Sequence, residues 1–131
     1  MTESVADRLP GDVLSLLRET MEVQIETRPA PDVPPHLTTI WVVVDPQDRA
    51  FIRTYRGAGS RWYREATASG HVALLADGQR IEVRVSLSTD QGSIEACSEA
   101  FRTKYRSSRS SLAAMLVPEV LGTTLELLPS D

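Results

Sequence analysis

The chain reads FIRTYRGAGSRWYR from Phe51 to Arg64, and its pattern changes twice along this stretch. The first five residues are mostly aromatic, β-branched or basic, which is typical of a strand. Two glycines then interrupt the pattern, and Ser60 carries the short hydroxyl side chain that commonly caps a helix. We therefore expect a strand, a glycine-containing turn and a helix that runs to about Ser69 and is closed by Gly70.

The same unit has the chemistry of an anion-binding site. Arg53 and Tyr55 share one face of the expected strand, while Ser60 and Arg61 stand at the expected helix start. Backbone N–H groups at a helix N-terminus, a hydroxyl and guanidinium groups together suit a phosphate. The alternative is a solvent-exposed arginine face that serves solubility, and the spacing alone favours neither interpretation.

Periodicity divides the rest of the chain into short elements. The expected strands are residues 21–26, 36–44, 49–55, 71–76, 79–87 and 123–128, and the further expected helices are residues 11–18, 93–106 and 112–116. Asp45-Pro46-Gln47-Asp48 and Asp77-Gly78 have the composition of hairpin turns. Four prolines within 29–35 predict a loop. Hairpins without βαβ alternation indicate a mainly β fold: a six-stranded antiparallel sheet curled into a small barrel, with inserted helices.

Length and composition indicate an ordinary globular domain. The chain has 131 residues, of which 41% are hydrophobic and 24% charged, so we expect one domain over 1–131 with a flexible N-terminus at 1–10. No apolar run approaches the length of a membrane-spanning helix, and the N-terminus does not resemble a signal peptide. With a single cysteine, the expected location is the cytoplasm.

The net charge of -4 hides two basic segments in an acidic chain. Five arginines and no acid lie in 49–64, and four bases and no acid lie in 102–109, whereas the remainder holds five bases and 18 acids. All seven aromatic residues lie in or close to these segments. Arginines interleaved with aromatics can bind nucleic acid, but the acidic remainder argues against a polyanionic partner and favours a small phosphate-bearing ligand.

The remaining candidate residues point to structural positions. His36 follows two prolines and is expected in a surface loop, and His71 is expected at a hairpin edge. Cys97 falls on the apolar side of its expected helix, where an inert buried thiol is the usual case. We expect no metal site, and no catalytic residue can be named because paired carboxylates and Ser/His/Asp or Cys/His sets do not stand out.

Residues 51–64, in this order of elements, resemble the flavin-binding split barrels related to pyridoxamine 5'-phosphate oxidase. In that superfamily an aromatic residue, a threonine, a small spacer and Ser-Arg hold the phosphate of FMN at this place. The resemblance implies that Thr54, Ser60 and Arg61 bind the phosphate, with Arg53 adjacent. The candidates for the wall beside the flavin ring are Tyr55, Trp62 and Trp41, although aromatics beside a barrel often belong to the core.

Two further likenesses narrow the resemblance. Trp62-Tyr63, followed by Asp77-Gly78 and Arg80-Ile-Glu-Val-Arg84, is similar to the deazaflavin-dependent nitroreductases. A small uncharacterised subfamily of these barrels is similar over roughly 21–129. Its shared motifs are the Tyr-Arg-Gly turn at 55–57, Phe101-Arg-Thr-Lys-Tyr105 and Thr124-Leu-Glu-Leu-Leu-Pro129.

The chain departs from the oxidase pattern at two charged positions. Trp62 stands in place of a lysine, and Thr38 and Thr39 stand where an arginine is expected. Each lost charge-assisted contact to phosphate removes about 1.5–3 kcal/mol. Arg53 and Arg56 are the residues that can compensate.

The resemblance implies a homodimer with the ligand between subunits and an oxidoreductase that uses FMN or a deazaflavin on an unidentified small molecule. The alternative is a non-catalytic binding protein of the same fold for an anionic or flavin-type ligand, with no redox cofactor required. Residues 102–109 are either a solvent-exposed helix face or part of the ligand site of a partner subunit.

Overall fold

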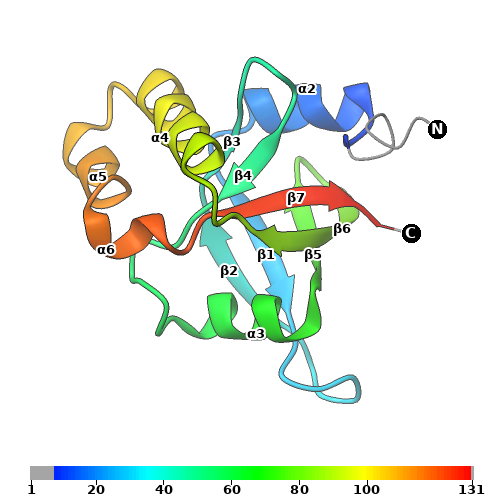
Figure 1. The fold of residues 1–131 in the computed structure, drawn as a ribbon. Coiled ribbons are helices and arrows are strands. Elements are labelled where there is room, and N and C mark those ends of the chain that lie inside the picture. The colour runs from blue at the N-terminus through cyan, green and yellow to red at the C-terminus, as the bar shows by residue number, and fades with distance from the viewer. Residues whose placement is uncertain (1–7, 131) are drawn as a thin grey trace.

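The computed structural model describes residues 8–130, and a curled antiparallel sheet forms its centre (Figure 1). The strands lie in the order β2-β1-β5-β6-β7-β4-β3, and each neighbouring pair runs antiparallel. Their bounds are β1 (Val23–Thr27), β2 (His36–Ile40), β3 (Val42–Val44), β4 (Ala50–Ile52), β5 (His71–Ala76), β6 (Gln79–Leu87) and β7 (Leu125–Pro129). The predicted mainly β fold with inserted helices is therefore confirmed.

Trp41 joins the two edges of this sheet. Only this residue separates β2 from β3, yet β2 pairs with β1 at one edge and β3 pairs with β4 at the other. The prediction of one strand over 36–44 is wrong, because the chain leaves the ladder at Trp41, and the described chain has seven strands instead of six. Since two strands separated by one residue form opposite edges, the sheet must curl until those edges approach each other.

Both predicted hairpin turns are confirmed. The Asp45 carboxylate accepts hydrogen bonds from the backbone N–H groups of Gln47 at 3.0 Å and Arg49 at 2.9 Å, which fixes the turn between β3 and β4. Between β5 and β6, Asp77 and Gly78 have φ angles of 49° and 78°. Two consecutive left-handed residues are what a tight two-residue hairpin requires.

The helices are α2 (Gly11–Glu19), α3 (Arg61–Ser69), α4 (Gln91–Lys104), α5 (Arg109–Ala114) and α6 (Pro118–Leu121). Gly70 closes α3 in a left-handed conformation, as predicted. α4 begins two residues before the predicted start, because the Asp90 carboxylate caps it by accepting from the Ser93 N–H at 2.9 Å. The helical segment predicted at 112–116 is replaced by the two short helices α5 and α6.

The expected strand 49–55 is shorter in the structure because its last residues bond to side chains. β4 ends at Ile52, and the next N–H groups do not continue a ladder. Instead, the Thr54 N–H donates to Thr123 Oγ1 at 3.3 Å. Thr123 in turn lies before the start of β7, which begins at Leu125 and not at the predicted residue 123.

The helices cover the sheet on different sides. In Figure 1, α2 and α3 lie at opposite ends of the curled sheet, and α4, α5 and α6 lie together against one side. One core cluster fills the sheet interior and includes Leu17, Ile25 and Trp62. A second cluster lies between β3, β4 and α4 and consists of Val43, Phe51, Cys97, Ala100, Phe101, Tyr105 and Met115.

The N-terminal part of the predicted domain is described only in part. Residues 1–7 of the expected flexible segment 1–10 lie outside the described residues, and Leu9 is buried in the first cluster. Within 8–130, no helix combines the length and the apolar character needed to cross a membrane.

Candidate functional site

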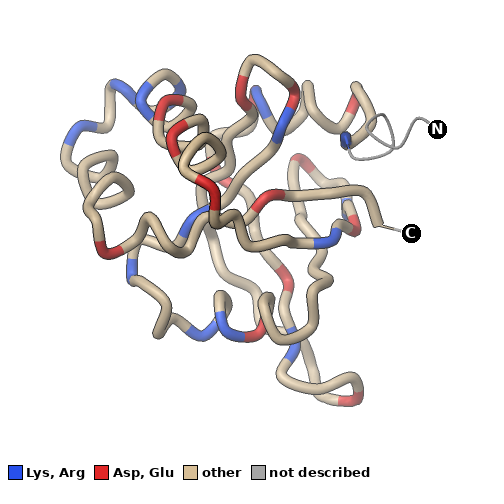
Figure 2. The backbone as a smooth tube through the Cα atoms, in the orientation of Figure 1, with Lys and Arg blue, Asp and Glu red and all other residues tan. Residues whose placement is uncertain are grey.

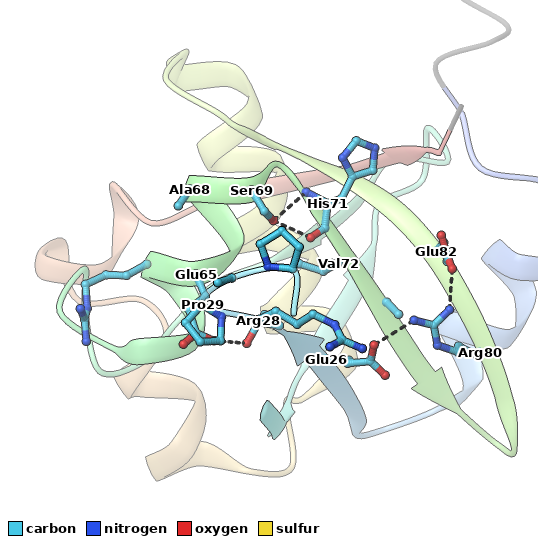
Figure 3. A pocket seen from close by; sticks show the side chains of 15 residues that line it. Glu26, Arg28, Pro29, Glu65, Ala68, Ser69, His71, Val72, Arg80 and Glu82 are labelled. Carbon is cyan, nitrogen blue, oxygen red and sulfur yellow. Dashed lines mark hydrogen bonds and ion pairs between the residues drawn. The ribbon is translucent and has the colours of Figure 1, made fainter. Parts of the chain in front are cut away.

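A hollow of about 690 Å³ lies beside α3, but the predicted site residues do not line it (Figure 3). Two of its three acids are paired with one of its arginines: Arg80 contacts Glu26 at 2.8 Å and also pairs with Glu82. Glu65, the third acid of this hollow, accepts a hydrogen bond from Thr27 Oγ1 at 2.8 Å. These carboxylates are therefore already neutralised or hydrogen-bonded by neighbouring side chains.

His36 belongs to this charge network, and its prediction as a surface-loop residue is wrong. It begins β2, and its Nδ1 lies 3.1 Å from the Glu65 carboxylate. Although burial acts in the opposite direction, hydrogen bonds from His36 and Thr27 hold the pKa of the Glu65 carboxyl below its usual value. His71 is exposed at the start of β5, as predicted.

A second hollow, of about 610 Å³, contains most of the predicted site, and we call it the β2–α5 pocket. It lies between β2, the loop that follows β4, the first turn of α3, and α5. Its lining residues are Glu22, Thr38, Thr39, Ile40, Trp41, Arg53, Thr54, Tyr55, Arg56, Trp62, Ser110, Ser111, Ala114 and Met115. The volume lies within the range usual for small-molecule sites.

Thr54 lines this pocket, and the Ser60 hydroxyl lies next to it without being among the lining residues. Thr54 Oγ1 and Ser60 Oγ lie 3.1 Å apart, so the turn that contains Gly57, whose φ is 84°, brings the two predicted phosphate ligands together. Ser60 occupies the N-cap position of α3 without a side-chain capping hydrogen bond. Thr54 Oγ1 also accepts from the Arg56 N–H at 3.2 Å, which fixes the start of the turn.

Arg56 and Arg61 lie differently with respect to the pocket. Arg56 lines it, and its Nε donates to the Tyr55 hydroxyl at 3.2 Å while its guanidinium lies 5.4 Å from the centre of the Tyr55 ring. Arg61 is the exposed first residue of α3 and is not among the lining residues. Of these two arginines, only Arg56 lines the pocket, although the sequence predicted only a compensating role for it.

Arg53 lies in the interior. Its side chain is fully buried and packs 5.5 Å from the centre of the Phe101 ring. Its guanidinium donates, at 2.9–3.1 Å, to Thr124 Oγ1, Ser98 Oγ and the carbonyl oxygens of Met115 and Ile94. Four hydrogen bonds occupy most of the five N–H donors of a guanidinium, so Arg53 connects four segments of the chain and has little capacity left for a ligand.

The Arg53 charge has no ion-pair partner among the described residues. Burial lowers the pKa of its guanidinium, yet an arginine starts from so high a value that it stays protonated. A permanent positive charge therefore stands beside the pocket, balanced only by hydroxyl and carbonyl dipoles.

The three predicted wall aromatics all line the β2–α5 pocket. Trp41 stacks on Tyr105 with ring centroids 3.7 Å apart and an interplanar angle of 1°. Trp62 is buried and contacts the edge of Tyr63, whereas Tyr55 is 56% exposed. The pocket thus combines aromatic surface with hydroxyls and two arginines, the buried Arg53 and the exposed Arg56.

The second basic segment has a buried member, so its reading as a solvent-exposed face is wrong for Lys104. In Figure 2 the acids lie on the first part of α4 and the bases on its end and on α5. Arg102 is exposed near Glu99 and Glu95. Lys104 Nζ instead donates at 2.7–2.8 Å to the carbonyl oxygens of Leu17, Thr20 and Val42. Burial lowers the pKa of Lys104 to about 8.

Cys97 is fully buried, as predicted, and burial raises the pKa of its thiol to about 12 although Arg53 acts in the opposite direction. Such a thiol is unreactive at neutral pH. Within 8–130, no three His, Cys, Asp or Glu side chains come together as metal ligands.

Three polar residues of the pocket were not predicted from the sequence: Glu22, Ser110 and Ser111. The two serines belong to α5, more than 50 positions after Thr54, and only the packing of α5 brings them to the same hollow. The serine-rich composition of this segment is a signal of a loop or helix start and not of a ligand site.

Solved structures with the same fold share little sequence with this chain. A conserved hypothetical protein from Mycobacterium tuberculosis has a TM-score of 0.68 at 14% identity, over 96% of this chain and 84% of that one. HutZ, the heme storage protein from Vibrio cholerae, gives 0.63 at 13% over 95% and 92%. A "Putative Pyridoxamine 5'-phosphate oxidase" from Listeria innocua gives 0.60 at 15% over 92% of each chain. These likenesses show a fold of the pyridoxamine 5'-phosphate oxidase type.

Sequence comparison identifies the family. No curated protein matches the chain. The family described as "Uncharacterized protein conserved in bacteria (DUF2255)" matches residues 13–127, which include every described strand up to the middle of β7. Because this match spans most of the sequence, the chain belongs to the DUF2255 family.

Proposed function

We propose that the protein binds a phosphorylated flavin-type cofactor, FMN or a deazaflavin, in the β2–α5 pocket and acts as an oxidoreductase on a small molecule. The observation that carries the proposal is the 3.1 Å distance between the Ser60 hydroxyl and Thr54 Oγ1, where Thr54 lines a pocket that also has aromatic walls. Thr38 and Thr39, which stand where the oxidase pattern has an arginine, line the same pocket.

The residues present fit such a group in kind. The hydroxyls of Thr54 and Ser60 and the guanidinium of Arg56 are donors for a phosphate. Arg61 is a further base, exposed at the start of α3. The first-turn N–H groups of α3 lack a side-chain cap, which suits an anion. Trp41, Tyr55 and Trp62 supply flat apolar surface for a ring system.

When bound, a flavin-type cofactor supplies the hydride or electron transfer itself. The part of this chain is to bind and orient. The pocket hydroxyls and Arg56 fix the phosphate end, the aromatic walls exclude water from the ring, and the buried charge of Arg53 favours an anionic ligand over a cationic one. In this proposal Arg53 acts through the pocket walls that it holds, and not by contact.

A homodimer belongs to this proposal. Tyr55, which lines the β2–α5 pocket, is 56% exposed, and Leu37, which precedes the lining residue Thr38 on β2, is 49% exposed. A second copy of the chain would cover such apolar surface and complete the enclosure of a ring. The direct test is the oligomeric state in solution, measured by sedimentation at FMN concentrations above and below its dissociation constant.

The second candidate is a binding protein of the same fold without redox chemistry. Two observations favour it: Arg53 is committed to protein oxygens, and Glu22 is the only acid that lines the pocket. A site with few proton donors and acceptors suits storage or transport better than turnover. The storage role in the name of HutZ makes heme a ligand to include in the test.

Binding is tested by titrating the protein with FMN and, in parallel, with riboflavin, which lacks the phosphate. The quenching of flavin fluorescence reports both affinities. We expect FMN to bind more tightly, and we expect Arg56→Ala and Arg61→Ala each to weaken FMN at least tenfold while riboflavin affinity and the melting temperature barely change. Arg64→Ala is the matched control, because Arg64 is exposed on the same helix but lines the other hollow.

The absence of saturable flavin binding at low salt would exclude the flavin proposal. Equal weakening of FMN and riboflavin in the arginine variants would show that these side chains do not contact phosphate. To separate the two candidates, the bound flavin is reduced chemically and mixed with small acceptors. Accelerated reoxidation relative to free flavin supports an oxidoreductase, and unchanged reoxidation supports a binding protein.

A further inference from the structure

The Trp41 ring is held on one face before any ligand arrives. Tyr105, at the end of α4, stacks on it in parallel with a centroid distance of 3.7 Å, and Phe101 lies at a tilted 6.3 Å. Both rings belong to the motif Phe101-Arg-Thr-Lys-Tyr105. The motif therefore places its aromatic residues on the inner side of Trp41.

Tyr105 is itself fixed by backbone groups of Met21 and of Val42, the residue after Trp41. Its hydroxyl donates to the Met21 carbonyl at 2.6 Å and lies 3.4 Å from the Val42 N–H. Lys104 Nζ donates to the Val42 carbonyl at 2.7 Å. The backbone of Val42, the residue after Trp41, is thus hydrogen-bonded to two consecutive side chains at the end of α4. These bonds fix the backbone at the break between β2 and β3.

The rest of the Trp41 ring faces the β2–α5 pocket. Trp41 is partly exposed and lines the pocket, whereas Tyr105 is buried and does not. A parallel stack on one face leaves the opposite face as the surface that a ligand can reach. An indole that is already immobilised loses little rotamer entropy when a second ring stacks on it.

We propose that Trp41 is the stacking platform for the planar ring of the pocket ligand, and that Tyr105 is its positioning residue. The proposal rests on the β2–α5 pocket as the ligand site of the proposed function, but not on the ligand being a flavin. A flavin and a porphyrin share the required chemistry, which is a flat aromatic ring wide enough to cover an indole.

The direct test uses lumichrome, a flavin ring without the ribityl phosphate, together with FMN and hemin. Replacing Trp41 by leucine should weaken the binding of lumichrome and of FMN by the same factor, about tenfold, because only the contact with the ring is lost. Trp41→Phe, which keeps an aromatic face, should recover about half of this effect on a logarithmic scale. Tyr63→Phe is the matched control, because Tyr63 is a buried aromatic residue of α3 that does not line the pocket.

Tyr105 is tested by two variants. Tyr105→Phe keeps the stack and removes the hydroxyl contacts, and we expect ring affinity to fall less than in Tyr105→Leu, which removes the stack as well. The spectroscopic readout is the red shift of the bound flavin absorption band on stacking, which a purely structural tyrosine would not change at saturating ligand. If Tyr105→Leu does not fold, the Trp41 variants decide the proposal by themselves.

The outcomes separate this proposal from the proposed function. Binding of FMN and lumichrome that is unchanged in Trp41→Leu would overturn the platform and leave the flavin function standing. Binding of hemin but not of FMN, with loss in Trp41→Leu, would support the platform and overturn the flavin function. Equal losses for FMN and lumichrome in Trp41→Leu, with little loss in Tyr63→Phe, would support both.

Discussion

Arg53 is a fully buried cation and Lys104 a partly buried one, each from one basic segment, and neither pairs with a carboxylate among the described residues. The planar guanidinium of Arg53 reaches α4, the α5–α6 connection and Thr124, the residue before β7. The ammonium of Lys104 meets three carbonyl oxygens from α2, the segment after it and β3. In sequence both resemble solvent-exposed bases, yet each joins distant segments of the backbone.

The difference between the two cations lies in their chemistry. An arginine offers five donors in a fixed plane and keeps its charge, whereas a lysine offers three donors around one nitrogen and can lose its proton when buried. Burial lowers the pKa of Lys104 to about 8 and leaves Arg53 charged. The cation that stays charged, Arg53, therefore lies beside the pocket, and the cation that can lose its proton, Lys104, lies at the C-terminal end of α4.

The largest expected effect is that of Arg53→Met. It leaves the carbonyl groups of Ile94 and Met115 without their donor and removes a hydrogen bond from Ser98 and Thr124. Unsatisfied buried groups cost about 1–3 kcal/mol each, so we expect a loss of about 3–5 kcal/mol in the free energy of unfolding. Urea denaturation measures this, and a loss below about 1 kcal/mol would contradict the assigned role.

A smaller loss is expected for Lys104→Met. Three carbonyl oxygens lose their shared donor, but Lys104 is only partly buried and water can replace part of the contact. We expect about 2 kcal/mol by the same measurement. Arg106→Met is the control, since this neighbouring base is exposed, and it should stay within about 0.5 kcal/mol. Equal effects of the two variants would remove the distinction between the buried and exposed bases.

The pH dependence of stability sharpens the comparison further. The pKa of Lys104 lies at about 8 in the folded chain and near its ordinary 10.5 in the unfolded one. Between these values the unfolded chain binds a proton that the folded chain does not, so the Lys104 contribution raises the free energy of unfolding as pH rises, with a slope of at most about 1.4 kcal/mol per pH unit.

This slope is obtained from the difference between the wild type and Lys104→Met over pH 8 to 10. The difference is needed because burial raises the pKa of Cys97 to about 12, which lowers stability as pH rises above 9 in both proteins. A difference that stays constant with pH would mean that Lys104 does not titrate in this window.

The smallest expected effect is that of Arg102→Ala. Arg102 lies two residues before Lys104 in α4. Its contacts to Glu99 at 3.4 Å and to Glu95 at 3.8 Å are exposed. Surface ion pairs contribute about 0–1 kcal/mol, so we expect a change of about 0.5 kcal/mol or less that shrinks further in salt. Thermal unfolding at two salt concentrations checks this, and a change comparable with that of Lys104→Met would refute the division.

Local patterns predicted most elements of the fold. The hairpin at Asp77-Gly78, the closure of α3 by Gly70 and the turn held by Asp45 were readable because each depends on the conformational preferences of a few adjacent residues. The break at Trp41 was not readable, because alternation continues through it. It arises because β2 pairs with β1 and forms one edge of the sheet, whereas β3 pairs with β4 and forms the other.

The candidate site divides in the same way. Residues 51–64 alone indicated a phosphate-type turn, and the structure brings Thr54 and Ser60 within 3.1 Å of each other. The placement of Arg53 inside, Arg61 outside and Arg56 at the pocket could not be read from spacing. Side-chain burial depends on which helix covers the strand, and α4 and α5 are supplied by residues far away in the chain.

By itself, the sequence determined the class of fold, its turns and caps, and two basic aromatic segments in an acidic chain, because these depend on local conformation and composition. Tertiary structure decided which of those bases are inside, where the sheet bends and which aromatic rings share a pocket. The physical reason is that a buried cation or a stacked ring is defined by partners 60 or more positions away, such as Met115 for Arg53 and Tyr105 for Trp41.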